Sequence, residues 1–317
     1  MMEYKKKIHF LSIVLIMLII FFVFLGLNSK NWEYALSRRI PKIVGIILTG
    51  SSIAFSSVVF QTITNNRILT PSVLGLDSLY IFIQTFIVFI FGSNSLIRVD
   101  QRFNFILAVG FMVLFSVILF RLLFKRENNN IFFLLLFGIV FGTFFQSLSS
   151  FMQFVIDPNE FLVVQNRMFA SFNNINSDIL WLALVGKILI IIYTYRFLSN
   201  LDVLSLGREN AINLGVDYDK VVKKMLIVIS ILVSISTALV GPITFLGLLV
   251  VNITRGLLNT YKHKYLIPGS MLISSITLVG GQLIAERVMN FSTPISVVIN
   301  FVGGIYFIHI LLREGKM

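Results

Sequence analysis

The side chains that could perform acid–base, nucleophilic or metal chemistry are few in this chain and lie far apart. Its 317 residues include 14 Asp and Glu, three His and no Cys. The carboxylates do not form the closely paired aspartates that a prenyl-transfer or other metal-dependent membrane enzyme would use to hold magnesium. Without cysteine there are no disulfides, thiolate metal ligands or Cys nucleophiles. His9, His263 and His309 lie near the ends of apolar segments, where we expect lipid headgroup contacts. We therefore expect no catalytic residue, no metal site and no directly bound cofactor.

Ionisable residues in the middle of apolar segments would indicate an ion-coupled carrier, because charge inside a bilayer is costly and usually functional. Asp77 and Glu286 lie near the ends of such segments, and only Lys187 lies in the middle of one. The sequence also contains no Gly-x-x-x-x-Gly-Lys-Ser/Thr loop for a nucleotide. We expect a separate subunit to supply the energy, with a secondary carrier that needs no ATPase as an alternative.

The elements that must position these residues are membrane helices. Hydrophobic residues make up 57 % of the chain and charged residues 13 %, against about a quarter charged in soluble domains. A helix crosses the hydrocarbon core with about 20 apolar residues. About ten such segments are expected, at 8–27, 42–61, 73–92, 104–120, 131–156, 179–197, 225–240, 243–258, 266–285 and 296–312. The sequence thus predicts an all-α, polytopic membrane protein with a single domain, 1–317.

The net charge of +12 does not indicate nucleic-acid binding, because that requires a basic face on a soluble domain. With a cytoplasmic N-terminus, the cytoplasmic segments would hold about two thirds of the 26 Lys and Arg residues. This is the bias that orients membrane proteins. We therefore expect both termini in the cytoplasm, an even number of spans, contact with lipid and no nucleic-acid partner.

Four motifs occur in order between Arg39 and the last apolar segment. The first is Arg39-Ile-Pro-Lys42, followed by a span ending at Gln61 and then by Asn66-Arg-Ile-Leu-Thr-Pro71-Ser-Val-Leu-Gly75. The second is Leu206-Gly207-Arg208-Glu-Asn-Ala211-Ile-Asn-Leu214-Gly215-Val216. The third is Gly241-Pro242-Ile-Thr-Phe-Leu-Gly-Leu248, and the fourth is Pro294 with Gly303-Gly304. In these residues the sequence resembles the FecCD-type permeases of bacterial ABC importers for iron-siderophores, haem or vitamin B12.

The sequence departs from that family's pattern at several positions. Arg67 replaces a usual proline, and Val251-Asn252 replaces Pro-His. Gly75-Leu-Asp-Ser-Leu-Tyr80 and the segment 168–174 also differ from the common motifs. In the last two of these departures, at 75–80 and 168–174, the sequence resembles the branch of the family that carries catecholate-type siderophores such as petrobactin and anguibactin.

The resemblance implies the fold and partners of a type II ABC importer permease in the bacterial cytoplasmic membrane. A second permease subunit, identical or closely related, would complete the pathway. Two cytoplasmic ATPases would use ATP to drive alternating access, and an extracytoplasmic binding protein would deliver a ferric siderophore. The same machinery carrying haem or a corrinoid is the alternative substrate assignment.

The resemblance also assigns residues to three roles. Contact with the ATPase is expected from the cytoplasmic segment 198–224, at Leu206, Gly207, Arg208, Ala211, Leu214, Gly215 and Val216. The binding protein is expected to dock on Arg39, Lys42 and Arg287. The translocation pathway or its gates are expected at Gln61, Asn66, Pro71, Gly75, Arg167, Gly241, Pro242 and Asn252.

Two of these expectations have a physical basis in the sequence. A short helix at 207–214 would carry Ala211 and Leu214, three residues apart, on one face, and Gly215 would end it in a left-handed turn. Arg167, in the outer loop before the sixth span, would attract an anionic catecholate chelate through its charge and by stacking on its rings.

Overall fold

The computed structural model describes residues 2–27, 32–92, 100–123, 131–173, 175–290 and 293–314. Throughout these ranges the regular elements are helices and the chain contains no strand, as the sequence predicts. Within the described residues, seven helices are long and apolar enough to cross a membrane, and α3, α12 and α14 are shorter apolar helices.

Each of the ten predicted segments corresponds to one helix of the structure. These helices are α1 (Met2–Phe24), α2 (Trp32–Thr64), α3 (Leu76–Phe91), α5 (Gln101–Leu123), α6 (Ile131–Val155), α8 (Ser177–Tyr195), α11 (Tyr218–Val240), α12 (Leu246–Leu258), α13 (His263–Arg287) and α14 (Ile295–Glu314). Within the described residues, the elements that the hydropathy did not predict are the short helix η1 (Pro71–Leu74), α7 (Pro158–Met168) and α9 (Leu198–Leu204). Helix α10 (Arg208–Asn213) is the expected short helix.

Helix α2 lies at the centre of the bundle and packs against α8, α11, α12 and α13. In the most apolar stretch of α2, 83 % of the residues are buried, whereas in that of the peripheral α1 the share is 17 %. With 33 residues it is roughly 50 Å long, longer than a hydrocarbon core of about 30 Å. It begins ten residues before the predicted start at 42 and continues through Pro41. Helix α2 can therefore connect the two ends of the protein.

Helices α2 and α13 approach closely at the middle of their contact. The Ser274 hydroxyl donates to the Gly50 carbonyl at 2.8 Å. A Cβ added to Gly50 would lie 2.8 Å from Leu278 Cδ1 and 3.0 Å from Ser274 Oγ, so a larger residue would require these two side chains of α13 to shift. The two helices thus pack as one unit over much of their length.

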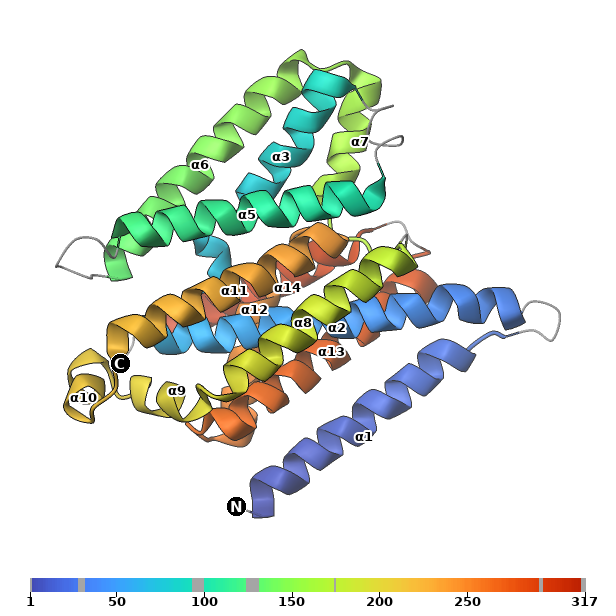
Figure 1. The fold of residues 1–317 in the computed structure, drawn as a ribbon. Helices are drawn as coiled ribbons and strands as arrows, with labels where there is room; N and C mark the ends of the chain where they lie inside the picture. Colours follow the sequence, from blue (N-terminus) through green and yellow to red (C-terminus); the bar gives the residue numbers. More distant parts are fainter. Residues whose placement is uncertain are drawn as a thin grey trace.

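Figure 1 shows α9, α10 and both chain ends at the same end of the bundle, whereas α7 lies at the opposite end. We call these the inner end and the outer end. Both ends of an all-helical chain lie together only when it crosses the bundle an even number of times, which agrees with the predicted ten spans.

Candidate functional site

The short helix α10 at the inner end has the predicted cap. Its N-cap, Gly207, has φ +92°, and Gly215 follows the helix with φ +81°. The Gly215 N–H bonds to the Ile212 carbonyl at 2.9 Å and the Val216 N–H to the Ala211 carbonyl at 3.0 Å. These are the paired bonds of a Schellman motif, which ends a helix and reverses the chain. The predicted left-handed turn at Gly215 is confirmed.

The predicted common face of Ala211 and Leu214 is wrong. Ala211 is fully buried against its own chain, whereas Leu214 is 62 % exposed. The helix ends at Asn213, so Leu214 belongs to the turn and points away from the bundle. Leu206 and Ile212 are also exposed. We call Leu206, Ile212 and Leu214 the inner apolar patch.

Charged residues around α10 pair within the chain. Arg208 lies 3.5 Å from Asp219 and over the ring of Tyr218 at 5.9 Å, which ties α10 to α11. Asp217 caps α11 by accepting from the Lys220 N–H, and the hydrogen bond from the Lys220 side chain lowers the pKa of Asp217. Because these ion pairs are exposed, each contributes little stability and serves mainly to orient the segment.

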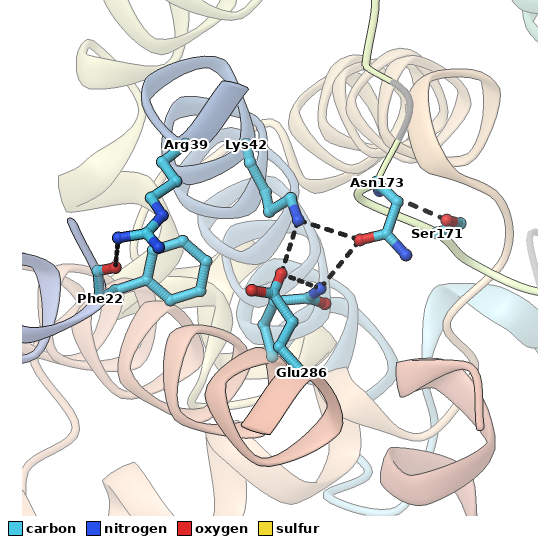
Figure 2. Close-up of polar contacts among 7 residues, drawn as sticks. Phe22, Arg39, Lys42, Ser171, Asn173 and Glu286 are labelled. Carbon is cyan, nitrogen blue, oxygen red and sulfur yellow. Dashed lines mark hydrogen bonds and ion pairs between the residues drawn. The ribbon is translucent and has the colours of Figure 1, made fainter. Parts of the chain in front are cut away.

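At the outer end, two of the predicted docking residues bind the last turn of α1. Arg39 Nη1 donates to the carbonyls of Val23 and Leu25 at 2.5 and 3.0 Å, and a longer bond to Phe22 is drawn in Figure 2. Arg287 Nη2 donates to the same Leu25 carbonyl at 2.9 Å. Carbonyls at a helix C-terminus lack partners in the helix, and cations stabilise them. Arg39 and Arg287 therefore fix α1 to α2 and α13.

The third predicted docking residue, Lys42, pairs with Glu286 of α13. Its Nζ lies 2.5 Å from Glu286 Oε1 and donates to Asn173 Oδ1 at 3.0 Å (Figure 2). Gln282 donates to both Glu286 and Asn173. These contacts join α2, α13 and the loop after α7.

A polar cavity of about 550 Å³ opens among α3, α5, α7, α11 and α13 at the outer end. Arg167 lines it beside the hydroxyl group of Tyr80. Gln84 and Asn104 also line the cavity, and their side-chain amides hydrogen-bond to each other in both directions at 3.3 Å. Arg167 lies in the last turn of α7 rather than in the predicted loop, because Asp157 caps a helix that Pro158 begins. The helix fixes the position of the guanidinium at the cavity wall.

Two predicted pathway glycines stand where backbones meet. Gly75 has φ +76°, and a Cβ there would lie 2.8 Å from the Gly138 carbonyl of α6. Gly241, which precedes Pro242, has φ +103°, and a Cβ there would lie 3.0 Å from Ala170 Cα. Both positions require glycine for conformation and for space. Pro71, which begins η1, places Gly75 against α6.

The remaining predicted pathway residues lie near the inner part of α2. Gln61 is 2 % exposed, and neither of its amide atoms has a hydrogen-bond partner within the described chain. Asn66 accepts from the Ile68 N–H in a turn after α2. Asn252 donates to the Arg67 carbonyl at 3.2 Å. Thus Arg67 and Asn252, both departures from the family pattern, contact each other. Of the other departure at 168–174, residues 169–173 line the cavity, and Asn174 is outside the described residues.

Two polar groups of the interior connect helices. Lys187 is buried on α8, and its Nζ donates to the Leu48 carbonyl at 2.9 Å and to the Ser51 hydroxyl, so it fastens α8 to α2. His263 is 1 % exposed and bonds to Asp202 and Thr62, so the expected lipid headgroup contact is wrong. No sequence signal connects Asp202 with His263, because they are 61 residues apart.

The arrangement of helices and the four motifs can be compared with known proteins. The model of the FecCD transport family matches residues 7–313. The chain belongs to this family. It is a multi-pass membrane permease of an ABC importer, with the type II permease fold that the family resemblance implies. A solved structure of a metal-chelate type ABC transporter, described as inward-facing, has a TM-score of 0.84 at 22 % identity and covers 98 % of this chain and 99 % of that one.

Two related permeases are similar over most of this chain. The petrobactin import system permease protein YclO of Bacillus subtilis (strain 168) is 62 % identical over 99 % of both chains. The petrobactin import system permease protein FatC of Bacillus anthracis is 36 % identical over 92 % of this chain and 82 % of its own. The relatives of this chain are thus transport proteins rather than enzymes.

Proposed function

We propose that this chain is the permease subunit of an ATP-driven importer that carries a ferric siderophore of the petrobactin class across the bacterial cytoplasmic membrane. The observation that carries the proposal is its 62 % identity, over 99 % of both chains, with a petrobactin import permease. The second petrobactin permease, at 36 % identity, supports the same substrate class.

The chain would work with a second permease subunit, two cytoplasmic ATPases and an extracytoplasmic binding protein. The inner end would face the cytoplasm, together with both termini and α9 and α10. The distribution of Lys and Arg supports this orientation. The inner apolar patch supports contact with an ATPase, because exposed apolar side chains on a polar segment are typical of interfaces. ATP would bind to the ATPases, and this chain would hold no cofactor itself.

Transport would proceed by alternating access, with the binding protein docking near Arg39, Lys42 and Arg287. Charge pairs across this docking contact would act mainly through steering and register. The guanidinium of Arg167 on the cavity wall supports attraction of an anionic chelate. The backbone contacts of Gly75 and Gly241 favour a role in helix packing at gates, whereas Gln61, Asn66, Pro71, Pro242 and Asn252 are proposed to border the pathway.

Uptake of labelled ligands by cells that lack the chromosomal permease tests the substrate. The gene for this chain should restore uptake of ferric petrobactin, but not of haem or cobalamin. Restored uptake of haem or cobalamin alone would assign the same machinery to the alternative substrate. In proteoliposomes, transport should require the ATPase and ATP. Transport by the purified chain alone would instead establish a secondary carrier.

A further inference from the structure

Three side chains from three elements meet in a polar cluster at the inner end of α2, where Thr62 and His263 are buried and the Asp202 side chain is 33 % exposed. His263, the first residue of α13, is 1 % exposed. Its Nδ1 lies 2.7 Å from Asp202 Oδ1 of α9, and its Nε2 lies 2.8 Å from the hydroxyl group of Thr62 on α2. We call Thr62, His263 and Asp202 the inner joint.

Each member of the inner joint has further bonds that fix its position. Asp202 Oδ1 also accepts from the backbone N–H of His263 at 2.7 Å, so the carboxylate caps the start of α13. The Thr62 hydroxyl lies 2.9 Å from the Val58 carbonyl within α2. Burial acts to raise the pKa of Asp202, but the hydrogen bonds from His263 outweigh it, and the pKa lies below its usual value. The carboxylate is thus held in its charged form against α13.

The inner joint lies at one end of the α2–α13 pair, and the Lys42–Glu286 pair joins the same two helices at the other. Between the two ends, Ser274 and Gly50 hold the helices in close contact. Helices α9 and α10 also contact each other. A continuous set of contacts therefore leads from the exposed inner apolar patch to the outer end of the protein.

We propose that the inner joint fixes the α9–α10 segment to the α2–α13 pair, so that a partner that displaces α10 moves both helices as one body. His263, Asp202 and Thr62 are positioning residues in this scheme, because they act through α10 and touch no substrate. A segment attached only by flexible loops would absorb such a displacement. The movement that a partner imposes through α10 rests on the proposed function, whereas the attachment of the α9–α10 segment to the α2–α13 pair does not.

Hydrogen–deuterium exchange of the purified permease in nanodiscs tests the attachment without any partner. Asp202→Ala removes the acceptor for both His263 donors, and we expect amide exchange in α9 and α10 to become about tenfold faster. Thr62→Val removes one hydroxyl at nearly constant volume and should have a smaller effect in the same direction. Thr62→Ser keeps the hydroxyl, so amide exchange in α9 and α10 should stay at the wild-type rate.

The chain offers a matched control in Thr64, two residues further along α2. Its hydroxyl donates to the Phe60 carbonyl at 2.8 Å within the same helix. Thr64→Val removes a hydroxyl of the same kind and should leave exchange in α9 and α10 unchanged. Unchanged exchange in both Asp202→Ala and Thr62→Val would overturn the attachment.

The coupling itself is measured with the full complex in proteoliposomes, as substrate transported per ATP hydrolysed. Asp202→Ala and Thr62→Val should lower this ratio several-fold while the ATPase still co-purifies, and Thr62→Ser and Thr64→Val should keep it. Faster exchange with an unchanged ratio would show a local structural role only and overturn the positioning role. If the wild-type complex needs no ATP, the proposed function fails, and the exchange data still decide the attachment.

Discussion

Lys42 and Glu286, 244 residues apart in the sequence, form an ion pair of 2.5 Å between Nζ and Oε1 at the outer end of α2 and α13. Their side chains are only 13 % and 14 % exposed, and Asn173 and Gln282 supply further hydrogen bonds. Removal of one partner from a pair this sheltered leaves the other charge poorly compensated. The pair is therefore part of the scaffold, whether or not Lys42 also contacts a binding protein.

Glu286→Ala should lower the stability of the permease by about 3 kcal/mol, because Lys42 loses its carboxylate in a largely buried site. Thermal unfolding in detergent measures the change. The exchanged pair Lys42→Glu with Glu286→Lys should recover part of the stability. If the exchanged pair is stable but inactive in uptake, Lys42 also serves the docking surface; full uptake would limit Lys42 to the scaffold.

Arg39→Glu together with Arg287→Glu should abolish uptake while the protein still inserts into the membrane. Both substitutions place a carboxylate against the C-terminal carbonyls of α1, so α1 should also become more accessible to protease. Arg38→Glu is the matched control, because Arg38 is exposed and lies over the ring of Tyr34 at 5.8 Å. Binding of the delivery protein, measured by surface plasmon resonance, separates the effects. Normal binding by the double variant would contradict docking on these arginines.

Leu214→Glu should leave the permease folded but abolish co-purification of the ATPase. Leu214 is 62 % exposed, so the substitution should cost the fold no more than about 0.5 kcal/mol. Ala211→Glu, in contrast, buries an unpaired charge beneath α10 and should destabilise the permease by about 3 kcal/mol or more. A pull-down beside a thermal unfolding curve distinguishes the two variants. Full ATPase association with Leu214→Glu would exclude the inner apolar patch as the contact.

Arg167→Ala should lower the rate of ferric siderophore uptake several-fold and reduce its dependence on salt. The guanidinium is the cation that α7 holds at the outer cavity beside Tyr80, and attraction of an anionic chelate weakens as salt increases. Arg167→Lys should keep most of the salt dependence but lose stacking on catecholate rings. An unchanged rate and salt dependence in Arg167→Ala would make Arg167 an ordinary surface residue.

The spans and the all-α class could be predicted from the sequence, and the family motifs recognised in it, because each depends on residues that are close together in the chain. A run of about 20 apolar residues is sufficient to cross a bilayer, and Gly215 ends α10 through the conformation of its own backbone. Helix α7 was not predicted, since a polar helix outside the core has no hydropathy signal and depends on the Asp157 cap.

The contacts between helix ends depend on the tertiary structure alone. Arg39 and Arg287 bind the end of α1, and Asp202 reaches His263, because packing brings segments together that are far apart in the chain. Packing also buries Ala211, whereas Leu214 points outward because α10 ends before it, although spacing along a helix favours a shared face. Hydropathy indicates which segments enter the membrane, whereas which side of each segment meets a neighbour is fixed only when the helices pack.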